Sequence, residues 1–111
     1  MDKVSQYRKY IQTLLSQYAQ DDVVPEGVEV QLIFDTDRDH YQWMNVGWQQ
    51  LHRVYRCVVH FDIQDGKIWL QQNLTDQNPA EDLVALGVPR EDIILGLQPP
   101  YKRPYTTYGA A

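Results

Sequence analysis

The stretch LIFDTDRDHYQWMNVGWQQLHRVYRCVVHFDIQDGKIWL, residues 32–70, decides the fold of this chain. Apolar and polar side chains alternate along it with the period of two that is typical of half-buried β-strands. The alternation breaks at an Asp-rich turn after Asp35, at a short run around Gln50, and at the dipeptide Asp65-Gly66. With its flanks, the stretch predicts four consecutive antiparallel strands, over residues 29–35, about 40–48, 53–64 and from 67 onward.

The turns set the expected register, because Asp-Gly between apolar runs favours a two-residue hairpin loop with positive φ at both positions. The expected pairs are Phe34–Tyr41 and Leu32–Trp43 in the first hairpin, and Gln64–Lys67, Ile63–Ile68 and Phe61–Leu70 in the last. One face of the sheet is then apolar and carries Cys57, Val59, Phe61, Ile63, Ile68 and Leu70. The other face is half polar, with His60, Asp62, Trp69 and Gln71. We therefore expect helices on one side of the sheet only.

Two helices are expected on either side of this stretch. Residues 2 to about 20 place apolar or aromatic side chains at steps of three and four, which form one stripe. The segment NPAEDLVALG begins with Asn78 as an N-cap and Pro79 at the first helical position. Glu81 fits a capping box and Gly87 fits the residue after the helix. These signals predict a short second helix.

The remaining segments complete an α+β fold. Ile93-Ile94-Leu95 is apolar enough to be buried, and the Pro- and Tyr-rich tail from about residue 98 favours extended chain. We predict a four- to five-stranded antiparallel meander with an N-terminal amphipathic helix and a short helix from the C-terminal half packed on one face. At 111 residues the chain fits a single domain, residues 1–111.

Composition narrows the class of protein. The single cysteine, Cys57, excludes an internal disulfide and a four-cysteine zinc site, and a lone thiol in an apolar strand indicates a reducing cytoplasm. The N-terminus has no apolar leader and no stretch is long enough to span a membrane, so we expect a cytoplasmic protein without membrane contact. The net charge of −5 counts against a stand-alone DNA-binding protein, because an acidic surface repels phosphates.

The run Asp35-Thr36-Asp37-Arg38-Asp39-His40 has the alternating aspartates of a calcium loop. Such a loop needs Gly at its sixth position and Glu at its twelfth, which here are His40 and Val46. A solvated turn therefore explains the three carboxylates better than a calcium site. We expect no metal or other cofactor.

Three other patterns were considered as catalytic sites. Cys57 and His60 are three residues apart, which puts them on opposite faces of a regular strand. His60 and Asp62 share a face, so a carboxylate could orient an imidazole as a general base. A polar sheet surface with an ordinary cross-strand pair explains them better. No serine or threonine is placed to complete a nucleophilic triad, and no glycine-rich phosphate loop is present. No catalytic residue is assigned.

Two mixtures of basic and aromatic residues remain, one around Arg53, Tyr55 and Arg56 and one in the tail. Such mixtures stack on single-stranded nucleic acid, and they are also the usual hot spots of protein interfaces. The acidity of the chain favours a protein interface. The candidate interface residues are His60, Asp62, Trp69, Tyr101, Lys102, Arg103 and Tyr105.

Four segments together resemble the XisI family, the fdxN element excision controlling factors. They are DKVSQYRKYIQTLL, QLIFDTDRDHYQWMNVGW, RVYRCVVHFDIQDGKIWLQQNLT and LVALGVPREDIILGLQPPYKRPYT. The family pattern includes FDTERDHY, VGW, DGKIW and LGVPKEDIVLGF in the same order and spacing. The chain departs from it at Asp37 for Glu, Arg90 for Lys and Leu97 for Phe.

The resemblance implies a cyanobacterial, cytoplasmic accessory factor for site-specific excision of a DNA element during heterocyst differentiation. It also implies a XisH-like protein partner encoded nearby. The family brings no catalytic residues to carry over, so we expect a non-catalytic role. The alternatives are a metal-dependent nuclease, using the Asp-rich turn or the surroundings of His60, and a direct DNA-binding factor. An exposed sheet edge or face could also support a homodimer.

Overall fold

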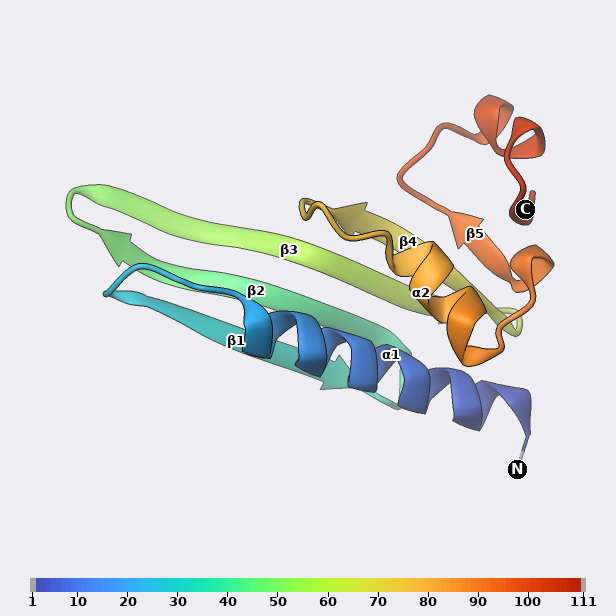
Figure 1. Cartoon of the computed structure of the whole chain (residues 1–111), viewed down its shortest axis with the longest axis horizontal. Helices are drawn as coiled ribbons and strands as arrows, with labels where there is room; N and C mark the ends of the chain where they lie inside the picture. The colour runs from blue at the N-terminus through green and yellow to red at the C-terminus, as the bar shows by residue number, and fades with distance from the viewer. Residues whose placement is uncertain (1, 111) are drawn as a thin grey trace.

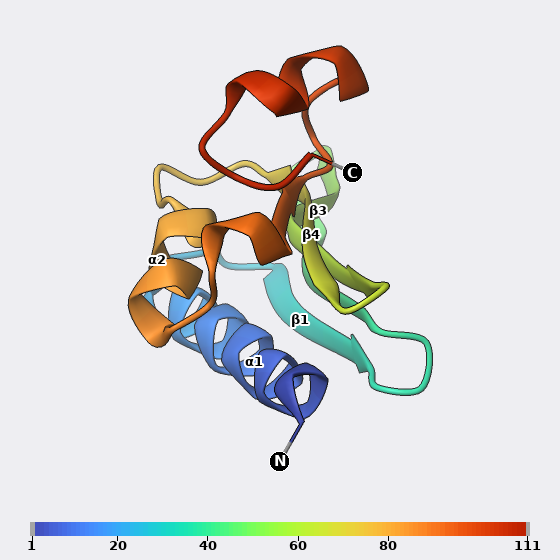
Figure 2. The same cartoon turned by 90° about the vertical axis from the view of Figure 1, so that its right-hand side faces the viewer.

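The computed structural model describes residues 2–110. The elements are α1 (Lys3–Asp21), β1 (Val28–Asp35), β2 (His40–Gln49), β3 (His52–Gln64), β4 (Lys67–Asn73), α2 (Pro79–Leu86), the 3-10 helix η1 (Arg90–Asp92), β5 (Ile93–Leu95) and the 3-10 helix η2 (Pro100–Tyr105). The strands form one sheet in the order β1-β2-β3-β4-β5. Both α-helices lie on the same face of this sheet (Figures 1 and 2). The predicted α+β class is confirmed.

The hydrophobic core fills the space between the helices and the sheet. The stripe of α1 contributes Tyr7, Ile11, Leu14 and Leu15, and the sheet contributes Tyr41, Trp43, Val58, Val59, Phe61, Ile63, Ile68 and Leu70. Each fully buried aliphatic or aromatic side chain stabilises the fold by about 1.5–3 kcal/mol relative to leaving it exposed. The other face of the sheet carries neither α1 nor α2 and is called the open face from here on.

The two predicted hairpin registers are confirmed. Phe34 pairs with Tyr41 and Leu32 with Trp43. Phe61, Ile63 and Gln64 pair with Leu70, Ile68 and Lys67. Asp65 and Gly66 have φ values of 53° and 76°, the positive angles that the Asp-Gly turn requires.

Cys57 does not lie in the core as predicted. The register pairs Trp43 with Val59 but Met44 with Cys57, so Val58 is an extra residue in a β-bulge. Val58 and Val59 are both buried, whereas Cys57 is half-buried. The prediction that Cys57 and His60 lie on opposite faces assumed a regular strand. The bulge shifts the alternation of side chains by one residue, so that prediction no longer holds. The Cys57 thiol contacts the carbonyl oxygen of Val59 at 3.5 Å.

The fifth strand departs from a pure antiparallel meander. β5 pairs with β4 in the parallel direction, with Ile68 opposite Ile93 and Leu70 opposite Leu95. The connection between them carries α2 across the helical face and returns the chain to the end of the sheet where β4 begins (Figure 1). A strand that follows such a crossover helix pairs in parallel.

The second helix has the predicted ends. The Asn78 side chain accepts a hydrogen bond from the backbone N–H of Glu81, and Gly87 is left-handed with φ of 112°. The Glu81 carboxylate does not close the capping box by reaching back to Asn78. It accepts hydrogen bonds from Arg90 and Tyr108 and so ties α2 to the segments that follow it.

The tail is more ordered than the extended chain predicted from about residue 98. Pro100–Tyr105 form η2, and Tyr108 packs against the core and donates to Glu81. Three prolines in a short segment fix φ near the value that a 3-10 turn also uses. Among the helices of residues 2–110, none is long and apolar enough to cross a membrane.

Candidate functional site on the open face

The open face carries a cluster of His40, His60 and Asp62 near the turns that follow β1 and β3. His40 is the cross-strand partner of Asp62, and His60 precedes Asp62 by two residues on the same face. The Nδ1 atom of His40 and the Nε2 atom of His60 each lie 2.7 Å from Oδ1 of Asp62. Two imidazoles from neighbouring strands therefore share one carboxylate oxygen.

Asp62 is 7% exposed, and its carboxylate is held on both sides. Gln71 donates to its Oδ2 atom at 3.1 Å. The register between β3 and β4 shifts at Gln71, and a bulge of this kind re-aims a side chain. Burial raises the pKa of Asp62, but the hydrogen bonds from His40 and His60 outweigh burial, so the net pKa is lowered and the group is ionised.

His40 is the accessible member of the cluster, with a side chain that is 52% exposed. Its hydrogen bond with Asp62 raises the pKa of the imidazole. Its Nε2 atom faces away from the carboxylate that Nδ1 contacts. A His–Asp pair of this kind can exchange a proton or bind a cation. Sequence reasoning grouped His60 with Asp62 but placed His40 in the Asp-rich turn, because the register between β2 and β3 was not known.

The aromatic part of the open face lies beside this cluster. Trp69 is the cross-strand partner of Asp62, and the guanidinium of Arg103 lies 5.2 Å from the centroid of the Trp69 ring. Arg103 also donates to the carbonyl oxygens of Leu95 and Gln98, at 3.2 Å and 3.1 Å. The structure therefore joins the strand residues of the predicted interface to Arg103 of η2.

The other predicted tail residues are exposed on η2. Tyr101 is 71% exposed and Tyr105 is 89% exposed, and Lys102 is also exposed. Within the described chain, Tyr108 docks and the other two do not.

The aspartates of the turn after β1 are occupied by internal contacts. Asp35 accepts from the backbone N–H groups of Asp37 and Arg38, at 3.1 Å and 2.9 Å. Asp39 accepts two hydrogen bonds from the Arg8 guanidinium and one from the Tyr41 hydroxyl. Asp39 therefore links the hairpin to α1, whereas Asp35 stabilises the turn itself.

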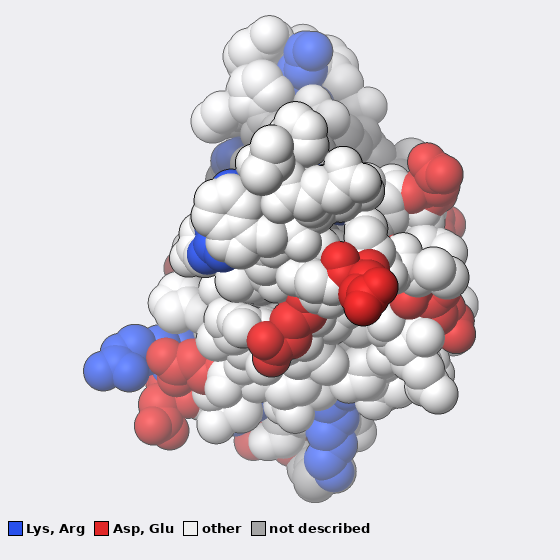
Figure 3. Space-filling view, turned by 90° about the vertical axis from the view of Figure 1, so that its left-hand side faces the viewer, with Lys and Arg blue, Asp and Glu red and all other residues white. Residues whose placement is uncertain are grey.

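The far end of the β2–β3 hairpin carries the second basic and aromatic mixture. The Arg53 guanidinium lies over the rings of both Trp48 and Tyr55, at 5.6 Å and 5.8 Å. Viewed from this end, the surface is mostly uncharged, and acidic and basic groups are scattered over it (Figure 3). This view shows no continuous basic face of the kind that binds nucleic-acid phosphates.

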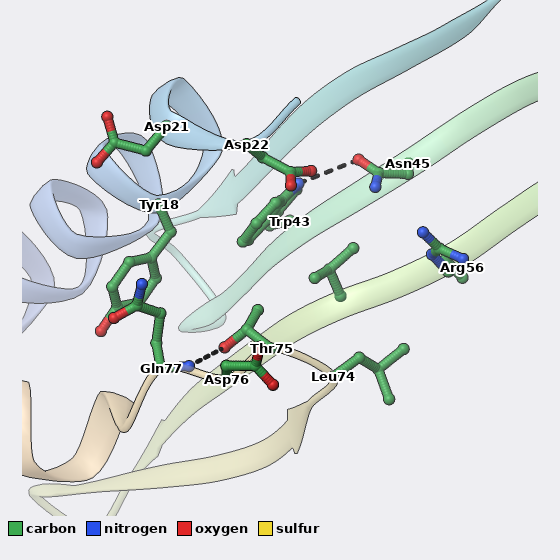
Figure 4. A pocket seen from close by; sticks show the side chains of 11 residues that line it. Tyr18, Asp21, Asp22, Trp43, Asn45, Arg56, Leu74, Thr75, Asp76 and Gln77 are labelled. Carbon is green, nitrogen blue, oxygen red and sulfur yellow. Dashed lines mark hydrogen bonds between the residues drawn. The ribbon is translucent and has the colours of Figure 1, made fainter. Parts of the chain in front are cut away.

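A pocket of about 480 Å³ lies on the helical side, between the end of α1, the strands β2 and β3, and the loop after β4 (Figure 4). Asp21, Asp22 and Asp76 line it together with Arg56. At its inner wall, buried Asn45 accepts a hydrogen bond from the Trp43 indole N–H at 3.1 Å. The charged residues that line the pocket are thus three acidic and one basic, and sequence reasoning did not predict the pocket.

The histidines and the cysteine are the remaining candidates for nucleophilic chemistry. Within residues 2–110, none of the three histidines is hydrogen-bonded to a serine, threonine or cysteine. Burial raises the pKa of the Cys57 thiol, which leaves it protonated and unreactive. The cluster therefore fits cation or proton binding better than nucleophilic chemistry.

These features define a class: a small α+β protein whose one-sided sheet presents an ordered polar and aromatic face. The chain belongs to the XisI family, whose model, described as XisI protein, matches residues 1–110. It is similar to the crystal structure of a XisI-like protein from Anabaena variabilis ATCC 29413, with 69% identity and a TM-score of 0.94 over 99% of this chain and 100% of that one.

The chain is also similar to the crystal structure of the fdxN element excision controlling factor XisI from the same organism. That likeness has 35% identity and a TM-score of 0.88, and it covers 99% of this chain and 100% of the other. No curated protein matches the chain. Both likenesses span the whole fold, so the resemblance seen in the sequence motifs extends to the arrangement of every element.

Proposed function

We propose that this protein is a non-catalytic accessory factor that controls excision of a DNA element by binding a XisH-like protein partner. Membership of the XisI family supports the excision role, because one similar structure is that of an fdxN element excision controlling factor. The name of that similar protein, a controlling factor, supports a regulatory role. The identity of the partner rests on the family resemblance.

The observation that carries the proposal is the exposure of Tyr101 and Tyr105 on an ordered segment. Tyrosine, tryptophan and arginine are the residues most enriched among interface hot spots. A mobile segment would lose backbone entropy on binding, but η2 is already held to β5 by the hydrogen bonds of Arg103. Preorganisation of this kind lowers the cost of association.

The polar residues beside this aromatic surface suit the edge of an interface. His60 and Asp62 lie on the same face as Trp69, and Lys102 is exposed on η2. A polar rim around aromatic anchors is the usual anatomy of a protein interface. The open face and η2 together form the surface that we assign to the partner.

The test is co-purification of the chain with the XisH-like protein encoded beside it. The double variant Tyr101→Ser/Tyr105→Ser should weaken binding by about tenfold or more, since hot-spot truncations cost about 2 kcal/mol or more. Tyr55→Ser is the matched control, because Tyr55 is 68% exposed but lies at the far end of the hairpin. Separate elution of the two wild-type proteins at micromolar concentration would reject the proposal.

Direct binding of single-stranded DNA is a second candidate, favoured by the stacking of Arg53 between Trp48 and Tyr55. Its affinity should fall steeply with salt, because lysine and arginine contacts to phosphates release counterions. A labelled oligonucleotide from the element end should then shift at about 50 mM salt and shift less with Tyr55→Ser. The absence of a shift at that salt concentration excludes this candidate.

A further inference from the structure

We propose that His40, His60 and Asp62 form a binding site for a divalent transition-metal ion, with Zn²⁺ as the best fit. Their ligand atoms, one from each residue, lie within 4.8 Å of one another. Two imidazole nitrogens and one carboxylate oxygen are ligands that such ions prefer. The inference goes beyond the proposed function, because it concerns a site that the chain builds without a partner.

The backbone fixes the three ligands rigidly. All of them come from the paired strands β2 and β3, and His40 stands directly opposite Asp62 in the register. A site on paired strands holds its geometry better than one on loops. The backbone N–H of Ile63 also donates to the carbonyl oxygen of Asp39 at 3.1 Å, which secures the end of the hairpin where His40 lies.

The hydrogen bonds of neighbouring side chains leave the three ligand atoms accessible to a metal ion. Gln71 occupies Oδ2 of Asp62 and leaves Oδ1 directed at the two imidazoles. The Gln42 amide lies 3.4 Å from Nδ1 of His60. If this amide is flipped, its oxygen accepts a hydrogen bond from Nδ1–H of His60 while His60 binds the ion through Nε2. Metal-binding histidines usually have an outer hydrogen-bond acceptor of this kind.

A metal ion would take the place of the protons that the imidazoles now direct at Asp62. The separations of 2.7 Å are those of hydrogen bonds, whereas bonds of about 2.0–2.2 Å to a tetrahedral ion set ligand atoms roughly 3.3 Å apart. Both imidazole nitrogens must therefore move away from Oδ1 of Asp62 by about half an ångström. The half-exposed side chain of His40 has room to do so. The fourth position then faces solvent and takes a water molecule.

The charges also favour a cation. Asp62 is ionised and supplies a buried negative charge, and Asp35 contributes a second negative charge to the surroundings of His40. The positive charge of Arg38 acts on His40 in the opposite sense. Because an imidazole must lose its proton before it binds a metal ion, affinity should rise with pH.

The experiment titrates Zn²⁺ into the untagged, metal-free, full-length protein against a chelating dye. We expect one ion per chain, and we expect His40→Gln and His60→Gln each to weaken binding by more than about tenfold. Loss of a group that only hydrogen-bonds to a metal ligand lowers metal affinity by about 10–100-fold, so loss of a ligand itself should cost at least as much. Co²⁺ should give visible absorption bands in the wild type that both variants lose.

His52→Gln is the matched control, because His52 lies at the other end of the same hairpin, about 30 Å along β2 from His40. It should bind Zn²⁺ like the wild type. His40 lies at the exposed rim, so His40→Gln should keep the wild-type circular dichroism spectrum. It therefore tests the site even if a variant of the buried ligand, Asp62→Asn, fails to fold. The proposal is wrong if the wild type and the His40→Gln/His60→Gln double variant bind Zn²⁺ with equal affinity. It is also wrong if His52→Gln weakens Zn²⁺ binding as much as His40→Gln does.

Discussion

Asp92 links the 3-10 helix η1 to α1. Replacing it should lower the free energy of unfolding, and the contacts of its carboxylate indicate by how much. Its carboxylate accepts a hydrogen bond from the hydroxyl of Tyr7 in α1 and a second from Lys3. Tyr7 is 4% exposed and Asp92 is 9% exposed. Asp92→Ala leaves a buried hydroxyl without a partner and removes a hydrogen bond to a charged acceptor, which costs about 2–3 kcal/mol. The half-exposed Lys3 adds little.

Urea unfolding followed by circular dichroism measures this change. A lower midpoint with an unchanged slope indicates lost stability and not an altered denatured state. For a chain of 111 residues, each kcal/mol corresponds to about 4 °C, so the melting temperature should fall by roughly 10 °C. Glu91→Ala is the matched control, because Glu91 is exposed and lies in the same short helix.

The pH dependence tests the same reasoning independently. Burial raises the pKa of Asp92, but the hydrogen bonds from Tyr7 and Lys3 outweigh it and lower the net pKa. A carboxylate with a lowered pKa contributes stability above its ordinary pKa and loses it as the pH falls through the lowered value. The gap between wild type and Asp92→Ala should therefore close below about pH 4. A gap under about 0.5 kcal/mol at pH 7, or one that stays constant to pH 2, refutes the argument.

Three further outcomes are expected. His40→Gln should destabilise by less than about 1 kcal/mol, and more at pH 5.5 than at pH 9 by urea unfolding, because a raised histidine pKa contributes stability that is lost as the pH rises through it. Asn78→Ala should cost about 1 kcal/mol by the same assay, through loss of the N-cap. Gly47→Ala should lower the melting temperature more than Gly87→Ala, since an added Cβ would lie 2.0 Å from the Gly27 carbonyl oxygen, whereas Gly87 has open space.

The sequence predicted the parts of the fold that local signals determine. The alternation of apolar and polar side chains located the strands β1 to β4. The lengths of two turns fixed the β1–β2 and β3–β4 registers. Asn78 and Gly87 located the ends of α2. In each case the deciding residues lie within a few positions of the feature that they specify.

The features that were missed depend on contacts between distant segments. The bulge at Val58 has no turn signal, so Cys57 was placed on the wrong face. The direction of β5 depends on the path of α2 over the sheet and not on the residues of β5. The hydrogen bond between Tyr7 and Asp92 spans 85 residues, and no local pattern contains it.

The candidate site shows why the motif FDTDRDHY is better understood as a positioning device than as a calcium loop. Asp39 has φ of 62° and is held there by the hydrogen bonds from Arg8 and Tyr41. Its backbone carbonyl accepts from Ile63, which follows Asp62 in β3. The clamp on Asp39 therefore fixes the residue before His40 against the residue after Asp62. Asp39 thus helps to bring the imidazole of His40 to the carboxylate of Asp62.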